Sequence, residues 1–190
     1  VRAEDFTAHA IYSDMPSAGS FSCSNEALNQ LYRNTLWSMK GNFLDIPTDC
    51  PTRERAGWTG DAQIFVRTGS YLMETAAFFS KWLCDLALEQ RADGMVSNLV
   101  PNPNRRARKR SMFDQLEGSA GWGDAAVIIP WELYRLYGDT RLLAEQYPSM
   151  VAWVEYMRTN AAKIPWYSRL NPLRWFSAAE REHAKYIWEV

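Results

Sequence analysis

The sequence predicts an all-α domain made of antiparallel helix pairs. After residue 22, apolar residues recur at helical spacing in segments of about 10–20 residues. Short connections containing glycine or proline separate the segments, as in paired helices. No convincing strand pattern follows residue 22, and no tandem repeat can be aligned. A toroid of helical hairpins and an irregular bundle both satisfy these observations.

The chain begins with an extended lead-in over residues 1–22, which contains "AHAIYSD" and then Pro16 and Gly19. Ser24 is the expected N-cap of the first helix, and Gly41 is its expected stop. The apolar face of this helix comprises Leu28, Leu31, Tyr32, Thr35, Leu36 and Met39.

A second helix is expected to open at Gly60 or Asp61, with Ile64, Phe65, Tyr71 and Leu72 on it. Thr75 is the expected cap of a third helix, which Asp93 and Gly94 would end. The buried side of this third helix is predicted to carry Phe78, Phe79, Trp82, Leu83, Leu86 and Ala87.

A polar loop over 93–120 precedes a fourth helix that ends at Gly138, with Pro130 kinking it or marking its first turn. Segments 140–147 and 148–162 predict two more helices, the second opened by Pro148. Helical spacing favours packing roles for Trp82, Trp131 and Trp153. Residues 163–190 predict a loop, a short helix over 177–185 and an apolar exit without a stop signal, which indicates a truncation.

The composition argues against binding to nucleic acid or to a membrane. The 190 residues are 47% hydrophobic, enough for one core, and the net charge of −1 gives no general attraction to nucleic acid or to an anionic membrane. The basic run "RRARKR" at 105–110 is interpreted as a solvated loop. No membrane-spanning run or signal peptide pattern is visible, so the chain is expected to have neither nucleic-acid nor membrane partners.

Cysteines 23, 50 and 84 are odd in number and widely spaced, which favours a reducing, cytoplasmic compartment but leaves localisation otherwise unknown. With two histidines and no close pair of cysteine or histidine ligands, no metal site is expected.

The segment "NFLDIPTDCPTRERAGWTGDAQ" concentrates the residues that can do chemistry. Asp49, Glu54 and Asp61 could form a carboxylate group of the kind that divides proton-transfer work between a protonated and an ionised member. Trp58 offers a flat face for a sugar ring, and Arg53 can hold hydroxyls or a carboxylate. A solvated ion-pair network with Trp58 as a packing anchor explains the same residues.

The stretch "DIPTDCPTRERAGWTGDAQ" resembles the signature of the glycoside hydrolase family 78 α-L-rhamnosidases. Further similarity lies in "SDMPSAGSFSCSNEALNQL" and in "GWGDAAVIIPWELYRLYGDTRLLAEQYPSM", so that the resemblance covers roughly residues 8–160. It implies an (α/α)6 barrel, a toroid of six helical hairpins. Residues 1–22 would be a linker from a preceding β domain, and 23–190 the first part of the barrel.

The resemblance also implies inverting hydrolysis of terminal α-L-rhamnosyl residues from glycosides or polysaccharides, without a cofactor. Glu54 matches the general acid of the family, and Asp49 and Asp61 match carboxylates that hold the rhamnose hydroxyls. Arg53 and Trp58 fall in the same pocket.

Trp122 in "GWGDA" matches an aromatic wall of that pocket. Asp124 is a weaker substrate-binding candidate, because an acid early in a helix can be there to favour the helix dipole. The family's general base lies in the later half of the barrel, and no segment of this chain matches it. The chain is therefore expected to need the remainder of the same polypeptide for activity and to be inactive alone. Homo-oligomerisation is left open.

Two other functions fit the same residues. The chain could belong to another (α/α)6 glycosidase with a different sugar specificity. It could also be a helical carbohydrate-binding module that keeps the loop without catalysing a reaction; the presence of Glu54 between two aspartates argues against this second alternative.

Overall fold

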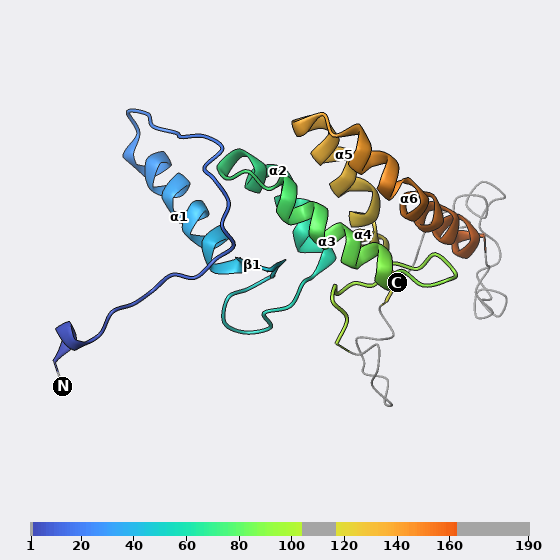
Figure 1. The fold of residues 1–190 in the computed structure, drawn as a ribbon, viewed down its shortest axis with the longest axis horizontal. Helices are drawn as coiled ribbons and strands as arrows, with labels where there is room; N and C mark the ends of the chain where they lie inside the picture. The colour runs from blue at the N-terminus through green and yellow to red at the C-terminus, as the bar shows by residue number, and fades with distance from the viewer. Residues whose placement is uncertain (1, 104–116, 163–190) are drawn as a thin grey trace, which may run out of the picture.

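The computed structural model describes residues 2–103 and 117–162, and in them the chain is helical, as predicted. Helix α1 lies toward one end of the molecule and α6 toward the other, with the remaining α-helices between them (Figure 1). A short 3-10 helix, η1 (Ala3–Asp5), precedes them. The α-helices are α1 (Glu26–Asn42), α2 (Thr59–Leu72), α3 (Ala76–Glu89), α4 (Ala120–Gly123), α5 (Ala125–Tyr137) and α6 (Thr140–Ala161).

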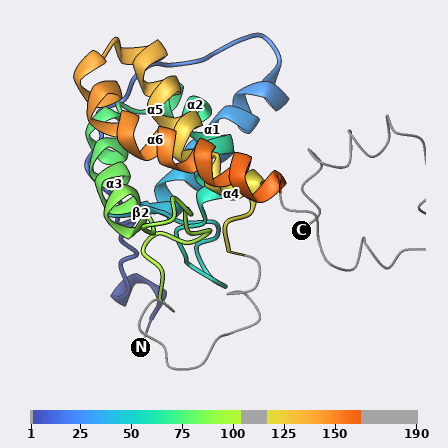
Figure 2. The same cartoon turned by 90° about the vertical axis from the view of Figure 1, so that its right-hand side faces the viewer.

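The core lies between α2, α3, α5 and α6, which pack side by side (Figure 2). Trp82 of α3 and Trp153 of α6 are completely buried there. The predicted buried face of α3 is confirmed for Phe78, Phe79, Trp82, Leu83 and Leu86. Phe43, which follows α1, stacks on Phe78 with ring centroids 4.9 Å apart and thereby joins the end of α1 to this core.

Several helix boundaries differ from the prediction. The N-cap of α1 is Asn25 rather than Ser24, because the Asn25 side chain accepts the Ala27 amide at 3.0 Å. Gly41 does not stop α1, which ends one residue later. Helix α2 begins at Thr59, earlier than Gly60. Helix α3 ends at Glu89, well before Gly94.

Gly138 ends α5 in the left-handed conformation, as predicted, and Pro130 lies inside that helix. The expected break at Pro148 is wrong, since α6 is one continuous helix. The packing of one buried face along the whole of α6 offsets the backbone hydrogen bond that Pro148 cannot make. This face comprises Leu142, Gln146, Ser149 and Trp153. The short helix α4 was not predicted.

A small antiparallel hairpin corrects the expectation of no strands after residue 22. Strands β1 (Phe43–Leu44) and β2 (Ile46–Pro47) pair around Asp45, whose φ is +67°. Aspartate tolerates this left-handed conformation better than most residues. Two-residue strands are too short to show an alternating pattern, so no periodic signal predicts them.

The lead-in is extended beyond η1, and residues 13–18 are hydrogen-bonded to the helical unit. The Ser13 amide donates to the Phe43 carbonyl at 2.8 Å, and the Ala18 amide donates to the Leu72 carbonyl at 3.1 Å. The Glu74 amide donates back to Pro16, and Met15 is buried in the core. A domain boundary at residue 22 stays a prediction, and these contacts attach part of the lead-in to the helices.

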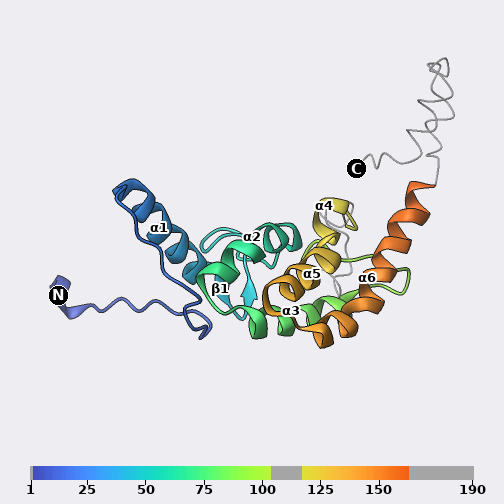
Figure 3. The same ribbon diagram turned by 90° about the horizontal axis from the view of Figure 1, so that it is seen from above.

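Some apolar side chains predicted to pack are exposed. Trp131 is 48% exposed, so its predicted packing role is wrong, whereas Trp82 and Trp153 are confirmed. Leu28 and Leu31 of α1 are also exposed, and α1 lies at one end of the row of helices (Figure 3). The basic run 105–110 and the expected helix 177–185 lie outside the described residues.

Candidate functional site

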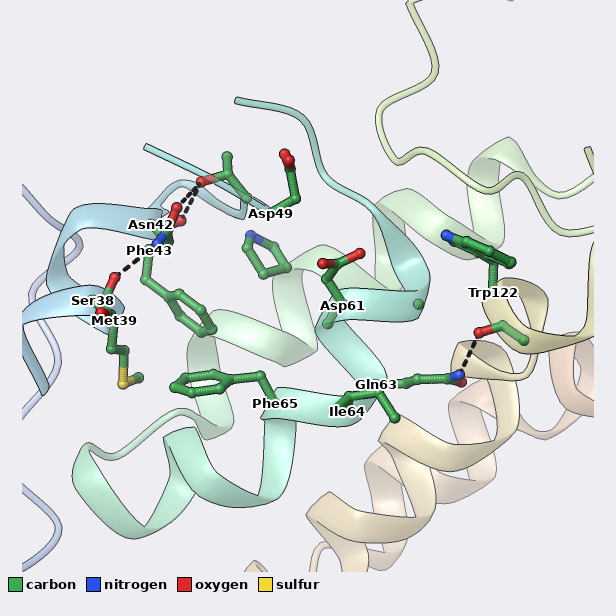
Figure 4. A pocket seen from close by; sticks show the side chains of 15 residues that line it. Ser38, Met39, Asn42, Phe43, Asp49, Asp61, Gln63, Ile64, Phe65 and Trp122 are labelled. Carbon is green, nitrogen blue, oxygen red and sulfur yellow. Dashed lines mark hydrogen bonds between the residues drawn. The ribbon is translucent and has the colours of Figure 1, made fainter. Parts of the chain in front are cut away.

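A cavity of about 660 Å³ opens between the end of α1, the β1–β2 hairpin, the first half of α2 and α4 (Figure 4). Its walls combine aromatic and aliphatic side chains with two carboxylates, a pattern suited to a ligand that has both apolar faces and hydroxyl groups. The lining residues are Ser38, Met39, Asn42, Phe43, Pro47, Thr48, Asp49, Gly60, Asp61, Ala62, Gln63, Ile64, Phe65, Gly121 and Trp122.

The loop between the hairpin and α2 is closed at its base by Asp49 and Ala56. The Asp49 amide donates to the Ala56 carbonyl at 3.1 Å, and the Asp49 carboxylate accepts the Ala56 amide at 3.0 Å. Arg55, just before Ala56, has φ +50°, which lets the chain turn back within so few residues. The two prolines at 47 and 51 restrict the loop further.

The loop is also attached to the segment that follows α3. The Gly57 carbonyl accepts the Val100 amide at 2.9 Å, and the Thr59 amide donates to the Asn98 carbonyl at 2.9 Å. A Cβ on residue 57 would lie only 2.0 Å from the Val100 oxygen, so only glycine allows this close approach. Trp82 donates to the same Val100 oxygen at 2.9 Å and connects the site to the core.

Glu54 is held by three contacts within the loop. Its carboxylate accepts the Trp58 indole N–H at 3.0 Å and lies 3.3 Å from the Arg53 guanidinium. Its amide donates to the Cys50 sulfur at 3.0 Å. Because the Arg53 side chain is 81% exposed, the ion pair is screened by water and contributes little. Of these two contacts to the carboxyl group, the hydrogen bond from the Trp58 indole is therefore the stronger one.

Asp49 and Asp61 have opposite electrostatic environments. Burial acts to raise the pKa of Asp49, but hydrogen bonds from the Cys50 thiol, the Ala56 amide and the Glu54 carboxyl outweigh it, so the pKa lies below its usual value. Burial raises the pKa of Asp61, and the neighbouring Asp49 charge adds to the rise. Asp49 therefore stays ionised to lower pH than Asp61.

Asp49 and Glu54 belong to the same short loop, and Asp49 also lines the cavity. Neighbouring carboxyl groups of this kind can divide proton-transfer work between an acid and a carboxylate.

Trp122 forms an aromatic wall next to Trp58, with ring centroids 6.4 Å apart. Gly60 allows the indole to lie over the first turn of α2, because a Cβ there would approach the ring to 2.9 Å. The Gln63 side-chain amide donates to the Gly121 carbonyl at 2.6 Å and fixes the backbone that carries the wall. In Figure 4 the Asp61 carboxylate lies between Asp49 and Trp122.

The structure brings six of the seven residues singled out from the sequence to this region. Three line the cavity: Asp49, Asp61 and Trp122. Three others belong to the adjoining loop, where they contact one another: Arg53, Glu54 and Trp58.

Asp124 is placed elsewhere. It is not among the lining residues, and its carboxylate accepts the indole N–H of the buried Trp153 at 2.9 Å. It is also the N-cap residue of α5, although its side chain makes no capping hydrogen bond. Its observed contacts are those of a residue that stabilises the packing of α6 against the start of α5.

Sequence reasoning did not single out Gln63, although it lies inside the quoted motif. Its role depends on Gly121, which is 58 residues away, so no local pattern could reveal it. Cys50 was considered only as evidence for a reducing compartment. Its contact with Glu54 could have been predicted from the sequence. The two residues are four apart across a turn that contains a proline, and such a turn brings the Cys50 side chain near the Glu54 amide.

Within residues 2–103 and 117–162, no group of three or more histidine, cysteine, aspartate or glutamate side chains is placed to hold a metal ion. In the same part of the chain, no helix is both long and apolar enough to cross a membrane.

Comparison with known proteins identifies relatives of this chain. Residues 16–188 match the family model described as the bacterial alpha-L-rhamnosidase 6 hairpin glycosidase domain. The match includes the whole cavity, the adjoining loop and every helix from α1 to α6.

Two curated relatives are named alpha-L-rhamnosidase. The protein from Streptomyces avermitilis is 40% identical over 156 residues, which cover 82% of this chain and 14% of that protein. The protein from Alteromonas sp. (strain LOR) is 42% identical over 157 residues, covering 81% of this chain and 16% of that protein. The chain thus spans about one seventh of the length of these relatives.

A solved structure is similar as well. The crystal structure of the Streptomyces avermitilis alpha-L-rhamnosidase complexed with L-rhamnose superimposes with a TM-score of 0.70 at 41% sequence identity. The superposition covers 78% of this chain and 14% of that chain. Both the sequence and the backbone arrangement of the described helices are therefore shared with this relative.

Proposed function

The chain belongs to the bacterial alpha-L-rhamnosidase six-hairpin glycosidase family, and from this membership we propose that it carries part of the active site of an enzyme that hydrolyses terminal α-L-rhamnosides. The proposed substrate is a rhamnose-containing glycoside or oligosaccharide. The proposed reaction is direct displacement by water with inversion at the anomeric carbon.

One observation carries the proposal: the Glu54 carboxyl group accepts the Trp58 indole N–H at 3.0 Å, in the loop that joins the cavity residues Asp49 and Asp61. In an inverting glycosidase a protonated acid protonates the leaving oxygen. A second carboxylate, about 6.5–9.5 Å from the acid, activates the water on the opposite face of the sugar. Glu54 is the proposed acid.

The other residues fit recognition of a sugar. Asp49 and Asp61 supply acceptors for hydroxyl groups, and Arg53 supplies donors at the cavity edge. Trp122 and Trp58 supply adjacent aromatic faces against which the apolar side of a rhamnose ring, including its methyl group, can pack. The general base would come from residues outside this chain. Asp124 is proposed to act by holding Trp153.

The test is hydrolysis of phenyl α-L-rhamnoside, whose leaving group needs protonation, by the natural polypeptide that contains these residues, compared with its Glu54→Gln variant. Loss of a general acid lowers the rate by about 10²–10⁴. The anomer first released, followed by NMR, reports the stereochemistry. The expected result is hydrolysis with inversion that Glu54→Gln reduces by this factor.

A panel of aryl glycosides separates the alternatives. Faster hydrolysis of another aryl glycoside would assign a different sugar to the same site and refute the rhamnoside specificity. Binding of rhamnose without turnover of any substrate would indicate a carbohydrate-binding module and refute the catalytic proposal. Activity that Glu54→Gln leaves unchanged would refute the role of Glu54.

A further inference from the structure

Cys50 is the residue of the loop whose contacts the proposed reaction does not yet use. Its sulfur accepts the Glu54 amide at 3.0 Å. A hydrogen bond from its thiol is also the largest of the effects that lower the pKa of the Asp49 carboxyl. One side chain therefore interacts with both Asp49 and Glu54.

The two contacts are compatible with the chemistry of a thiol. A neutral thiol has one S–H donor and a sulfur that accepts weakly. The hydrogen bond from the Cys50 thiol lowers the pKa of Asp49, and the sulfur accepts the Glu54 N–H at 3.0 Å. The half-buried thiol is in this way bonded in both directions.

The position of Glu54 depends on few other attachments. The base of the loop is fixed by Asp49 and Ala56, but the turn that carries Glu54 lies between them. The Glu54 side chain is 45% exposed, and its partner Arg53 is in water. Of the contacts that the structure describes for Glu54, the bond to Cys50 is the one that holds its backbone rather than its carboxyl group.

We propose that Cys50 is a positioning residue, which orients the Glu54 carboxyl for proton transfer by holding the Glu54 amide and the Asp49 carboxylate at once. The proposal rests on the proposed function, because it gives Cys50 its effect through the general acid. It predicts a defect in proton donation that is separable from a general loss of structure.

The experiment compares two α-L-rhamnosides in the natural polypeptide. Phenoxide leaves poorly and needs the proton, whereas 2,4-dinitrophenoxide leaves without it. Misplacement of a catalytic group by about 1 Å can cost ~10²-fold in rate. In Cys50→Ala, kcat/KM for the phenyl substrate is expected to fall by about 10- to 100-fold, and kcat/KM for the dinitrophenyl substrate to change little. A structural defect would lower both values by the same factor.

Cys84→Ala is the matched control, since Cys84 is an exposed free cysteine on α3 and should leave both rates unchanged. Cys50→Ser keeps a donor and an acceptor on a shorter bond, so its selective loss should be about threefold to tenfold, the value of one weakened hydrogen bond. This variant decides the question if Cys50→Ala does not fold.

The outcomes separate the two proposals. If the wild type hydrolyses both substrates and the Cys50 variants lose activity on them equally, or not at all, the positioning role is refuted while the proposed function stands. If the wild type hydrolyses neither substrate, the proposed function fails and the role of Cys50 fails with it. A selective loss on the phenyl substrate, partly restored by serine, establishes the role.

Discussion

The tight contact between Gly60 and Trp122 makes Gly60→Ala a sharp test of the cavity wall. The added Cβ would lie 2.9 Å and 3.0 Å from two atoms of the indole and 3.2 Å from the Gly121 oxygen. Ordinary contacts of a Cβ are 3.4–4 Å. The indole and its backbone must therefore retreat by roughly 0.5–1 Å, against the hydrogen bond from Gln63.

The same substitution also has a favourable effect, because alanine forms helix better than glycine by up to about 1 kcal/mol. The cost of moving the wall and this gain oppose each other, so the free energy of unfolding should change by less than about 1 kcal/mol. Binding has no such compensation. We expect KM for 4-nitrophenyl α-L-rhamnoside to rise by about tenfold, since a displacement of this size removes much of the contact with the sugar.

The assay measures KM and kcat together with the melting temperature and the tryptophan fluorescence of the natural polypeptide. Gly121→Ala is the control at a neighbouring residue, because its added Cβ would have no atom within 4 Å. If Gly60→Ala and Gly121→Ala give the same KM and the same emission, Trp122 does not form the substrate wall inferred from the structure.

Three further predictions concern stability. Asp124→Ala leaves the buried Trp153 indole without its carboxylate acceptor, so the free energy of unfolding in urea should fall by about 1–3 kcal/mol. A large change in KM without loss of stability would instead favour substrate binding by Asp124. Burial and the Asp49 charge raise the pKa of Asp61, so its ionised form destabilises the fold above the folded-state pKa, and this cost disappears below its ordinary value of 3.8. Asp61→Asn should therefore raise the melting temperature near pH 7 by at most ~2–4 °C, given solvent screening, and have no effect near pH 3; a pH-independent gain would contradict this sign. Trp82→Phe leaves the Val100 carbonyl without the indole donor and should cost about 1–3 kcal/mol in thermal or urea unfolding, and an unchanged stability would show that this link is not needed.

The fold was predictable where local chemistry and packing agree. Helix α3 carries its apolar residues on one face, and Gly138 is a glycine at a left-handed helix end, so spacing and conformational preference were sufficient. Pro148 shows the limit of such reasoning, because a continuous buried face outweighs its local preference. Trp131 shows a second limit, since helical spacing does not tell which side of a helix a neighbour will cover.

The candidate site followed from the sequence by resemblance, and its internal contacts did not. The motif identified Asp49, Glu54 and Asp61, and the structure places them around one cavity and its adjoining loop. The direction of each pKa shift depends on burial and on hydrogen bonds that a linear motif cannot express. The packing role of Asp124 depends on Trp153, which comes 29 residues later.

The attachment of residues 16–18 to the far end of α2 has a practical consequence for expression of this domain. Helix α2 is about 20 Å long, with Asp61 in its first turn. The backbone bond to Ala18 is at its last residue, Leu72, and the bond to Pro16 is at Glu74 just beyond it. A shortened chain that begins at residue 23, where composition suggests the domain starts, would remove both bonds and open the space that Met15 fills. Helix α2 could then tilt more freely, and this motion would displace the Asp61 carboxylate at its opposite end.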